Sequence, residues 1–479
     1  MARSARSYRT ALVPAAALAT ALATAAGALP AVAAPSAAAS SAAASSAAAA
    51  PAAVAQAPTT VATGTLDNGA AWQAEVPAGW NGKVVLFAHG FRPGPANPAW
   101  DAGFAPTAQE LIGRGYAVAS SSYAGTGWAL ETAVQDQLDT LAAFEQRFGE
   151  ADRVIAVGRS MGGLVTSLMA EVPGAGIDGA VSTCGLVGGG VALNNYQLDA
   201  AHAATELLLP GQDVQLTGFT APGQADATIA ALRAALEEAR GSAEGRARIA
   251  LVAALLHTPT ELDGVDTEDP EALAAAQADL VLQTLPTVIE RRHTIVEAAG
   301  GDSGWTAGVD YARVLRSSDQ RHQVRHLYRL AGLDLAEDLG TLTRTADIAP
   351  DEDGLEWMLR TSTPTGELQV PVLATHTLVD LLAPVEYQEE YAETVRRAGE
   401  QSLFRQAFVD REGHCSFTVA ENVAAVEAMD ERLETGHWGS LARASSLQRS
   451  AESLGLDGAA FVHHHPDEFV GDRTWTGAP

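Results

Sequence analysis

The sequence predicts an α/β domain with a mostly parallel sheet, an antiparallel N-terminal edge and a large inserted α-helical cap. Short apolar segments alternate with amphipathic segments between residues 83 and 183, as in strands joined by helices. Helical patterns then follow one another from 187 to 367, and strand patterns return at 370–376 and 403–409. One domain is therefore interrupted, and its expected parts are a core at 60–186 and 368–435, a cap at 187–367 and a C-terminal extension at 436–479.

The N-terminal residues have the composition of an export signal followed by a leader. Three arginines precede an Ala/Leu/Val-rich stretch at 11–33, so residues 1–33 are interpreted as a secretory signal peptide. The small residues that end this stretch suit a signal peptidase, and we expect cleavage near Ala33 and a secreted protein with no stable membrane insertion. Residues 34–59 are mainly Ala, Ser and Pro, which bury too little apolar surface to offset their ordering entropy, so this leader is expected to be disordered.

The overall composition excludes some partners. Hydrophobic residues make up 47% of the 479 residues, which is ample for a large core. The formal net charge of −28 would repel phosphate backbones and anionic lipids. We therefore expect no nucleic-acid partner and no anionic membrane surface as a partner.

The first half of the core is predicted as a hairpin followed by parallel strands. Residues 65–76 give two strand patterns around Asn68-Gly69, a dipeptide that favours tight hairpin turns. A buried strand at 83–89 leads into the glycine-containing loop 90–94. The remaining segments are strands at 116–121, 154–157 and 179–183 and helices at 107–114 and 132–147.

A Gly-Arg-Ser-Met-Gly sequence at 158–162 follows the strand 154–157 directly and leads into a helical pattern at 161–169. This context suits a nucleophile elbow, because glycines on both sides of a serine allow the strained turn that exposes its hydroxyl. The dipole of the following helix would point its positive end at a developing oxyanion. Ser160 is therefore the candidate nucleophile, and the alternative is an ordinary turn.

The two cysteines are expected to form a disulfide. Disulfides persist outside the cytoplasm, which fits the predicted export. Cys184 follows the strand 179–183 and Cys415 follows the last predicted strand, so both lie in loops at the same end of a parallel sheet. We predict a Cys184–Cys415 bridge, and the alternative is two unpaired buried thiols.

The elbow, the strand order and the insertion together resemble the α/β-hydrolase superfamily over residues 60–186 and 368–435. The resemblance implies the α/β-hydrolase fold and a catalytic triad in the chain order serine, acid, histidine. It also implies that no cofactor is needed.

Asp380 and His414 resemble the acid and the histidine of that triad. Asp380 lies just beyond the strand that resumes the sheet, in a loop where Thr377 replaces the usual glycine, and His414 follows the last predicted strand. In this family His414 would accept the proton of Ser160, and Asp380 would orient the imidazole. Asp410 is the alternative acid, because it lies close to His414 in the sequence.

The resemblance also implies an oxyanion hole made of backbone N–H groups. One donor would be Met161, the residue after the nucleophile. The second would come from the His89-Gly90-Phe91 loop, with Phe91 as the expected donor and Gly90 as the next choice. Tyr123 could present its hydroxyl to the same site, although packing is the more frequent role of such a residue.

Other motifs do not indicate a metal or a cofactor. Consecutive histidines at 463–465 would diverge on an extended segment and have no accompanying ligand pattern, so no metal site is expected. The glycines at 188–190 lack the context of a phosphate site and are interpreted as a hinge into the cap. Trp305 and Trp357 could line a pocket or pack internally.

These features predict a secreted serine hydrolase that cleaves carboxylic esters through an acyl-enzyme and acts on a small-molecule or peptide substrate. One alternative is a serine exopeptidase whose cap restricts entry, which an acidic cap pocket would favour. The alternative from another class is a non-catalytic binding protein on the same fold. In each case the helical cap is expected to decide what reaches Ser160.

Overall fold

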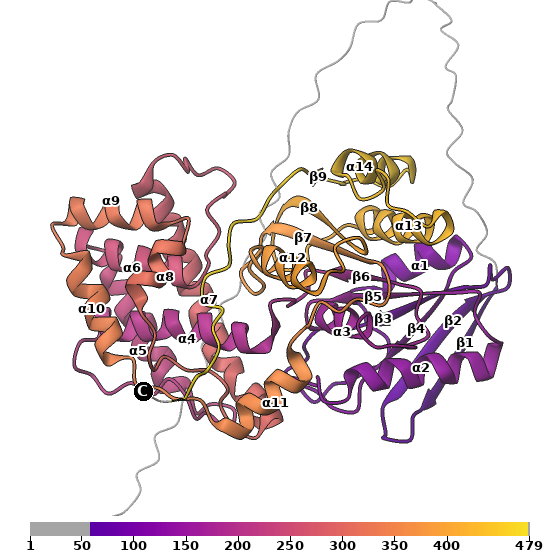
Figure 1. The fold of residues 1–479 in the computed structure, drawn as a ribbon, viewed down its shortest axis with the longest axis horizontal. Helices are drawn as coiled ribbons and strands as arrows, with labels where there is room; N and C mark the ends of the chain where they lie inside the picture. Colours follow the sequence, from indigo (N-terminus) through magenta and orange to yellow (C-terminus); the bar gives the residue numbers. More distant parts are fainter. Residues whose placement is uncertain (1–57, 478–479) are drawn as a thin grey trace, which may run out of the picture. The chain divides into compact units, whose positions relative to one another are not determined.

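The computed structural model describes residues 58–477, so the predicted signal peptide and nearly all of the predicted leader lie outside the described residues. Within this range one nine-stranded sheet has the strand order β1-β2-β4-β3-β5-β6-β7-β8-β9 (Figure 1). The strands are β1 (Thr59–Thr65), β2 (Ala71–Pro77), β3 (Lys83–Ala88), β4 (Ala117–Ser121), β5 (Arg153–Arg159), β6 (Gly179–Thr183), β7 (Val372–Val379), β8 (Phe404–Glu412) and β9 (Phe461–Val462).

The pairing of these strands confirms a mostly parallel sheet with an antiparallel N-terminal edge. β3 to β8 pair in parallel, whereas β1 and β2 are antiparallel to their neighbours. The chain therefore has the predicted α/β-hydrolase fold. β9 adds an antiparallel pairing with β8 at the other edge, which the sequence analysis did not expect because two residues carry no periodic signal.

Helices cover both faces of the sheet (Figure 1). The central strands are buried on both faces, which explains why their sequences are continuous apolar runs rather than alternating ones. One apolar cluster joins the sheet to α1, α13 and α14, and another joins the opposite face to α2, α3 and α12. These helices are α1 (Ala105–Gly113), α2 (Ala133–Phe148), α3 (Met161–Met169), α12 (Tyr387–Ala398), α13 (Val419–Thr435) and α14 (Ala444–Ser453).

The N-terminal hairpin forms around the predicted Asn-Gly turn. Gly69 has a φ of 91°, and Leu66 N–H donates to Ala70 O over 2.7 Å to close the turn. β1 begins at Thr59, so the strand takes up the last residue assigned to the leader. Its side chains are mostly exposed, and the apolar signal that would mark its start is correspondingly weak.

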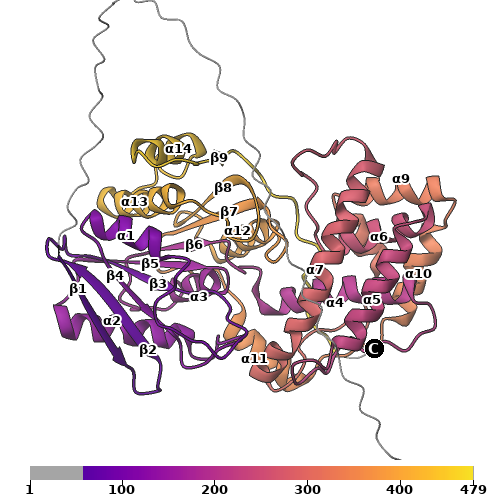
Figure 2. The ribbon, with the colours of Figure 1, turned by 180° about the vertical axis from the view of Figure 1, so that it is seen from behind.

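Eight helices between β6 and β7 form the insertion within the described residues, and Figure 2 shows α4 to α7, α9 and α10 gathered into one group. They are α4 (Gly189–Leu208), α5 (Asp226–Ala239), α6 (Ala243–Leu255), α7 (Pro270–Ala299), α8 (Tyr311–Ser317), α9 (Arg321–Ala331), α10 (Leu335–Thr345) and α11 (Glu352–Ser362). Residues 309–331 hold two separate helices, because Ser318 has extended backbone angles and ends α8 before α9 begins.

The glycines interpreted as a hinge lie at the start of α4 and pack closely against neighbouring side chains. A Cβ on Gly188 would lie 2.3 Å from the Tyr387 ring, and one on Gly190 would lie 2.2 Å from Met358 Sδ. Glycine is thus required here for close approach between the start of α4 and its neighbours.

The C-terminal extension returns to the insertion after β9. Phe469 stacks on His257 of the insertion with ring centroids 4.6 Å apart. Farther along, Arg473 Nη1 donates to Asp199 Oδ2 on α4 over 2.5 Å. The tail from 463 to 477 therefore links the sheet edge to the insertion.

Among the described helices, α7 has the length and composition needed to cross a membrane. However, 56% of its most apolar window is buried inside the protein. Such burial is typical of the core helix of a helical subdomain.

Candidate active site

Ser160 lies in a sharp turn between β5 and α3. Its φ of 61° and ψ of −124° are a strained conformation for a residue with a side chain. The flanking glycines make the turn possible, because a Cβ on Gly158 would lie 1.9 Å from Gly162 O and one on Gly162 would lie 2.0 Å from Ala88 O. Any larger residue at either position would displace the backbone, so the predicted elbow has a direct steric basis.

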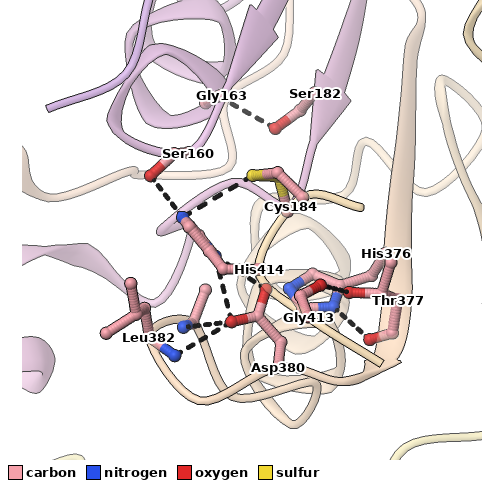
Figure 3. The surroundings of a disulfide bond; sticks show 12 residues. Ser160, Gly163, Ser182, Cys184, His376, Thr377, Asp380, Leu382, Gly413 and His414 are labelled. Carbon is pink, nitrogen blue, oxygen red and sulfur yellow. Dashed lines mark hydrogen bonds and ion pairs between the residues drawn. A yellow bond between two sulfur atoms is a disulfide. The ribbon is translucent and has the colours of Figure 1, made fainter. Parts of the chain in front are cut away.

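His414 connects Ser160 to Asp380 by hydrogen bonds (Figure 3). The imidazole Nε2 lies 2.7 Å from Ser160 Oγ. Its Nδ1 lies 2.9 and 2.8 Å from the two carboxylate oxygens of Asp380. The structure thus brings the three residues predicted from the sequence into one hydrogen-bonded series.

Asp380 is buried directly after β7 and is held as a carboxylate. Its Oδ1 accepts the backbone N–H groups of Leu382 and Ala383 at 2.9 and 3.0 Å. Burial alone would raise the pKa of Asp380, but the attraction and hydrogen bond of His414 lower it below its usual value. An ionised Asp380 can therefore orient the imidazole with its Nδ1–H toward the carboxylate.

A second buried histidine, His376, lies beside Asp380 on β7 (Figure 3). Burial lowers the pKa of His376, so the ring is neutral at pH 7. Its Nδ1 lies 2.8 Å from Thr377 O, while its Nε2 has no hydrogen-bond partner in the described part of the chain. Nothing in the strand pattern distinguished His376 from an ordinary core residue.

Cys184 and Cys415 form the predicted disulfide, with their Cα atoms 5.4 Å apart. The bridge joins the loop after β6 to the loop that carries His414 (Figure 3). Cys415 Sγ lies 3.6 Å from His414 Nε2, so the bridge borders the imidazole directly. The two sulfur atoms and this imidazole lie within 4.8 Å of one another, but disulfide sulfurs are not thiolates and do not provide a zinc-type ligand set.

The loop after β3 passes close to Ser160. A Cβ on Gly90 would lie 3.1 Å from Ser160 Cβ, which shows how closely this loop approaches the elbow. Within residues 58–477, the N–H groups of Phe91 and Met161 donate to no protein acceptor. Both are therefore available to a ligand oxygen, as expected of oxyanion donors.

Tyr123 supports this loop rather than presenting its hydroxyl to the site. The side chain is fully buried, and its hydroxyl donates to His89 O over 3.0 Å. The Tyr123 ring stacks on the His89 imidazole, with ring centroids 4.0 Å apart. Burial and the nearby Arg92 lower the pKa of His89 to about 4, so a neutral imidazole packs behind the loop.

A cavity of about 250 Å³ opens at Ser160 between the core and the insertion. The core lines the part of the cavity beside Ser160, with side chains that include Phe91, His414 and Trp128. The insertion contributes side chains from α4 and α7, which are Leu193, Gln197, Val288, Arg291, Thr294 and Ile295. The sequence analysis did not identify these six residues, because their place opposite Ser160 depends on tertiary packing.

The other candidates lie away from this cavity. Asp410 is exposed on β8, where its N–H pairs with Ala460 O, and it makes no contact with His414. His464 packs on Phe408, with ring centroids 5.2 Å apart. Trp305 packs against Trp475 of the C-terminal tail. Neither Trp305 nor Trp357 lines the cavity.

Comparisons with known proteins point to hydrolases. No family model matches the chain. An o-phthalyl amidase from Xanthobacter agilis is 28% identical over 453 residues, which cover 86% of this chain and 96% of that protein. An esterase from Pyrococcus furiosus aligns over 79% of this chain and 91% of its own, with 10% identity and a TM-score of 0.36. Feruloyl esterase B from Aspergillus oryzae aligns over 79% and 80%, with 16% identity and a TM-score of 0.36. These superpositions are loose, and the fold assignment rests on the strand order of the sheet itself.

Proposed function

We propose that this protein, which has the α/β-hydrolase fold, is a serine hydrolase that cleaves carboxylic esters through an acyl-enzyme. The observation that carries the proposal is the continuous hydrogen-bonded series from Ser160 through His414 to Asp380 at the floor of a cavity. A serine hydroxyl is a weak nucleophile at its free pKa, and this series supplies the base that activates it.

In the proposed first step, Ser160 Oγ attacks the substrate carbonyl while His414 Nε2 takes the hydroxyl proton. The imidazolium that forms donates its Nδ1–H to Asp380. The carbonyl oxygen becomes an oxyanion that accepts the N–H groups of Met161 and Phe91. Collapse of this intermediate breaks the bond to the leaving group, which His414 protonates, and leaves Ser160 acylated.

In the second step, water replaces the leaving group. His414 takes a proton from the water as its oxygen attacks the acyl carbon, and the second tetrahedral intermediate releases the carboxylic acid. Ser160 recovers its proton from the imidazolium. The sum of the two steps is the hydrolysis of one acyl bond by one water molecule.

Amide hydrolysis is a second candidate, and the relative from Xanthobacter agilis favours it. That protein is named as an amidase, and its likeness extends over 86% of this chain. An amine is a poorer leaving group than an alcohol, so protonation by His414 would matter more for an amide. Comparing matched esters and amides of one acyl group decides between the two bond types.

The exopeptidase alternative is less well supported. It required an acidic cap pocket for a free amino terminus, but the residues that line the cavity at Ser160 include no Asp or Glu and do include Arg159 and Arg291. A positively charged lining would repel an ammonium group.

We also propose that the protein acts outside the cytoplasm. The Cys184–Cys415 disulfide supports an oxidising compartment. The predicted cleavage near Ala33 lies outside the described residues, so N-terminal sequencing of the protein recovered from culture medium is the test.

A fluorophosphonate probe tests the proposed chemistry directly. The wild type should be labelled, Ser160→Ala should not, and Ser440→Ala, at an exposed serine, should be labelled like the wild type. Loss of the nucleophile should lower kcat by roughly 10⁶-fold, as in other serine hydrolases. Labelling of Ser160→Ala at the wild-type rate would overturn the proposal, and an unlabelled wild type would favour the non-catalytic binding alternative.

A further inference from the structure

Arg291 presents a guanidinium to the Ser160 cavity without an acidic partner. It lines the cavity from α7, and its Cζ lies 5.8 Å from the centroid of the Phe91 ring on the opposite, core side. In the described residues its side chain makes no ion pair and no hydrogen bond. The protein carries 58 acidic and 30 basic residues, so an arginine left unpaired inside a cavity is not explained by a shortage of carboxylates.

The neighbouring arginine shows what a structural arginine looks like on the same helix. Arg292 is buried, its Nε donates to Asp302 Oδ2 over 2.7 Å, and its Nη1 donates to Asn194 O over 3.3 Å. The bond to Asn194 ties α7 to α4, and the bond to Asp302 ties α7 to the segment that follows it. One residue earlier, Arg291 is rotated by about 100° around the helix, which directs it away from this anchor.

The rest of the α7 face fits a hydrocarbon group. Val288, Arg291 and Ile295 lie on one side of the helix at helical spacing, and all three line the cavity. Leu186 and Leu382 complete an apolar wall from the core. The cavity thus combines an apolar wall with the guanidinium of Arg291.

The other cation at the cavity is differently placed. The Arg159 guanidinium lies against the loop before α1, because a Cβ on Gly103 would be 2.8 Å from its Nη1. Arg159 also borders a second cavity on that side of the sheet. Arg291 is therefore the guanidinium that belongs to the substrate cavity alone.

We propose that Arg291 binds a carboxylate on the substrate, so that the protein selects acyl compounds that carry a second, ionised acid group. This inference rests on the proposed hydrolase function and adds the substrate class to it. A guanidinium binds a carboxylate through two parallel N–H···O bonds, and such charge-assisted pairs are stronger than neutral hydrogen bonds. The apolar wall would hold the carbon skeleton between the carboxylate and the scissile carbonyl.

The kinetic test uses 4-nitrophenyl esters in matched pairs. Two acyl skeletons are used, a 1,3-substituted benzoyl group and a six-carbon adipic chain. In each pair the far end of the skeleton carries either a carboxylate or the isosteric carboxamide. A second arm moves the charge to the leaving group by comparing 4-carboxyphenyl with 4-carbamoylphenyl benzoate. The wild type should prefer the carboxylate in one arm, and which arm shows the preference identifies the half of the substrate that Arg291 holds.

Substitutions then assign the preference to this residue. Arg291→Gln should lower the ratio of kcat/KM for carboxylate over carboxamide by about 10- to 100-fold, and Arg291→Lys by less, because a lysine keeps the charge but loses the bidentate geometry. Arg233→Gln removes the same charge from an exposed position on α5 and should leave the ratio at the wild-type value. An equal fall in Arg233→Gln would mean that overall charge sets the preference and would overturn the proposal.

A binding measurement separates this inference from the proposed function. Isophthalate and isophthalamide are titrated calorimetrically into the Ser160→Ala protein, with and without Arg291→Gln. Tighter binding of isophthalate that disappears with Arg291→Gln supports the inference, whether or not any ester is turned over. An absence of ester turnover would count against the hydrolase function alone. Equal affinity for the two ligands, or a wild type that prefers carboxamide esters in both arms, would overturn it.

Discussion

Removing the Cys184–Cys415 disulfide should destabilise the protein and slow its proposed reaction. The bridge closes a loop with a sequence separation of 231 residues, which contains the whole insertion. The chain-entropy relation gives about 5 kcal/mol for a loop of this length, and loss of native disulfides has cost about 2–5 kcal/mol. The double variant Cys184→Ala/Cys415→Ala should therefore lose free energy of unfolding toward the upper end of that range.

The same change should affect activity, because the bridge borders the base of the triad. Cys415 Sγ lies 3.6 Å from His414 Nε2, and the bridge ties the histidine loop to the loop after β6. A displacement of about 1 Å at a catalytic group can cost about 100-fold in rate, so we expect kcat to fall by at least about 10-fold.

Urea unfolding followed by circular dichroism, and ester hydrolysis in the absence of urea, measure the two effects. Reductant should lower both the unfolding midpoint and kcat of the wild type while leaving the double variant unaffected, which is the control for side effects of the reductant. A double variant with the unfolding free energy and kcat of the wild type would refute the reasoning.

Three further substitutions test separate parts of the fold and site. Gly158→Ala should destabilise the protein and abolish activity, because its Cβ would lie 1.9 Å from a backbone oxygen of the elbow, whereas Gly79→Ala, with nothing within 4 Å, should unfold like the wild type in urea. Asp380→Asn should lower kcat by about 10⁴-fold by disturbing the imidazole tautomer, as pre-steady-state ester hydrolysis would measure. Folding lowers the pKa of Asp380, so the ionised carboxylate stabilises the folded protein above the pH at which a free carboxyl group titrates. This stabilisation is lost as the pH falls through the lowered pKa of the folded protein. The difference in Tm between the wild type and Asp380→Asn should therefore shrink in acid. Arg473→Ala leaves the buried Asp199 without its cation and should cost ~3 kcal/mol in urea unfolding, and an unchanged midpoint would show that the C-terminal tail does not stabilise the insertion.

Ser160, Asp380 and His414 could be predicted as site residues from the sequence, because each follows a strand of the parallel sheet. Strands of a parallel sheet bring their carboxyl ends to one edge, and the resemblance to the α/β-hydrolase superfamily then gave the order serine, acid, histidine that selected Asp380 and His414 as partners of Ser160. The shared edge also paired Cys184 with Cys415.

The side chains that would choose a substrate could not be predicted in this way. Arg291 and Arg292 are adjacent in the sequence, yet Arg291 borders the cavity and Arg292 is buried against Asp302. The packing of α7 against α4 and the core sets this difference, and no local pattern encodes it.

Small local signals also explain the missed elements. The start of α4 was obscured by glycines, which disfavour helix when taken alone but here permit close packing against Tyr387 and Met358. β9 has two residues, and the tail that follows it is held by separate contacts such as Phe469 on His257 rather than by a periodic apolar face.

Trapping the acyl-enzyme tests the central claim most directly. The protein is mixed with a slowly deacylated 4-nitrophenyl ester, quenched in acid within the burst phase, digested and analysed by mass spectrometry. The proposed mechanism predicts the mass of one acyl group on the peptide that contains Ser160, in step with a burst of 4-nitrophenol, and neither signal in Ser160→Ala. Turnover of the ester with the acyl group on another residue, or with an undiminished burst in Ser160→Ala, would contradict it.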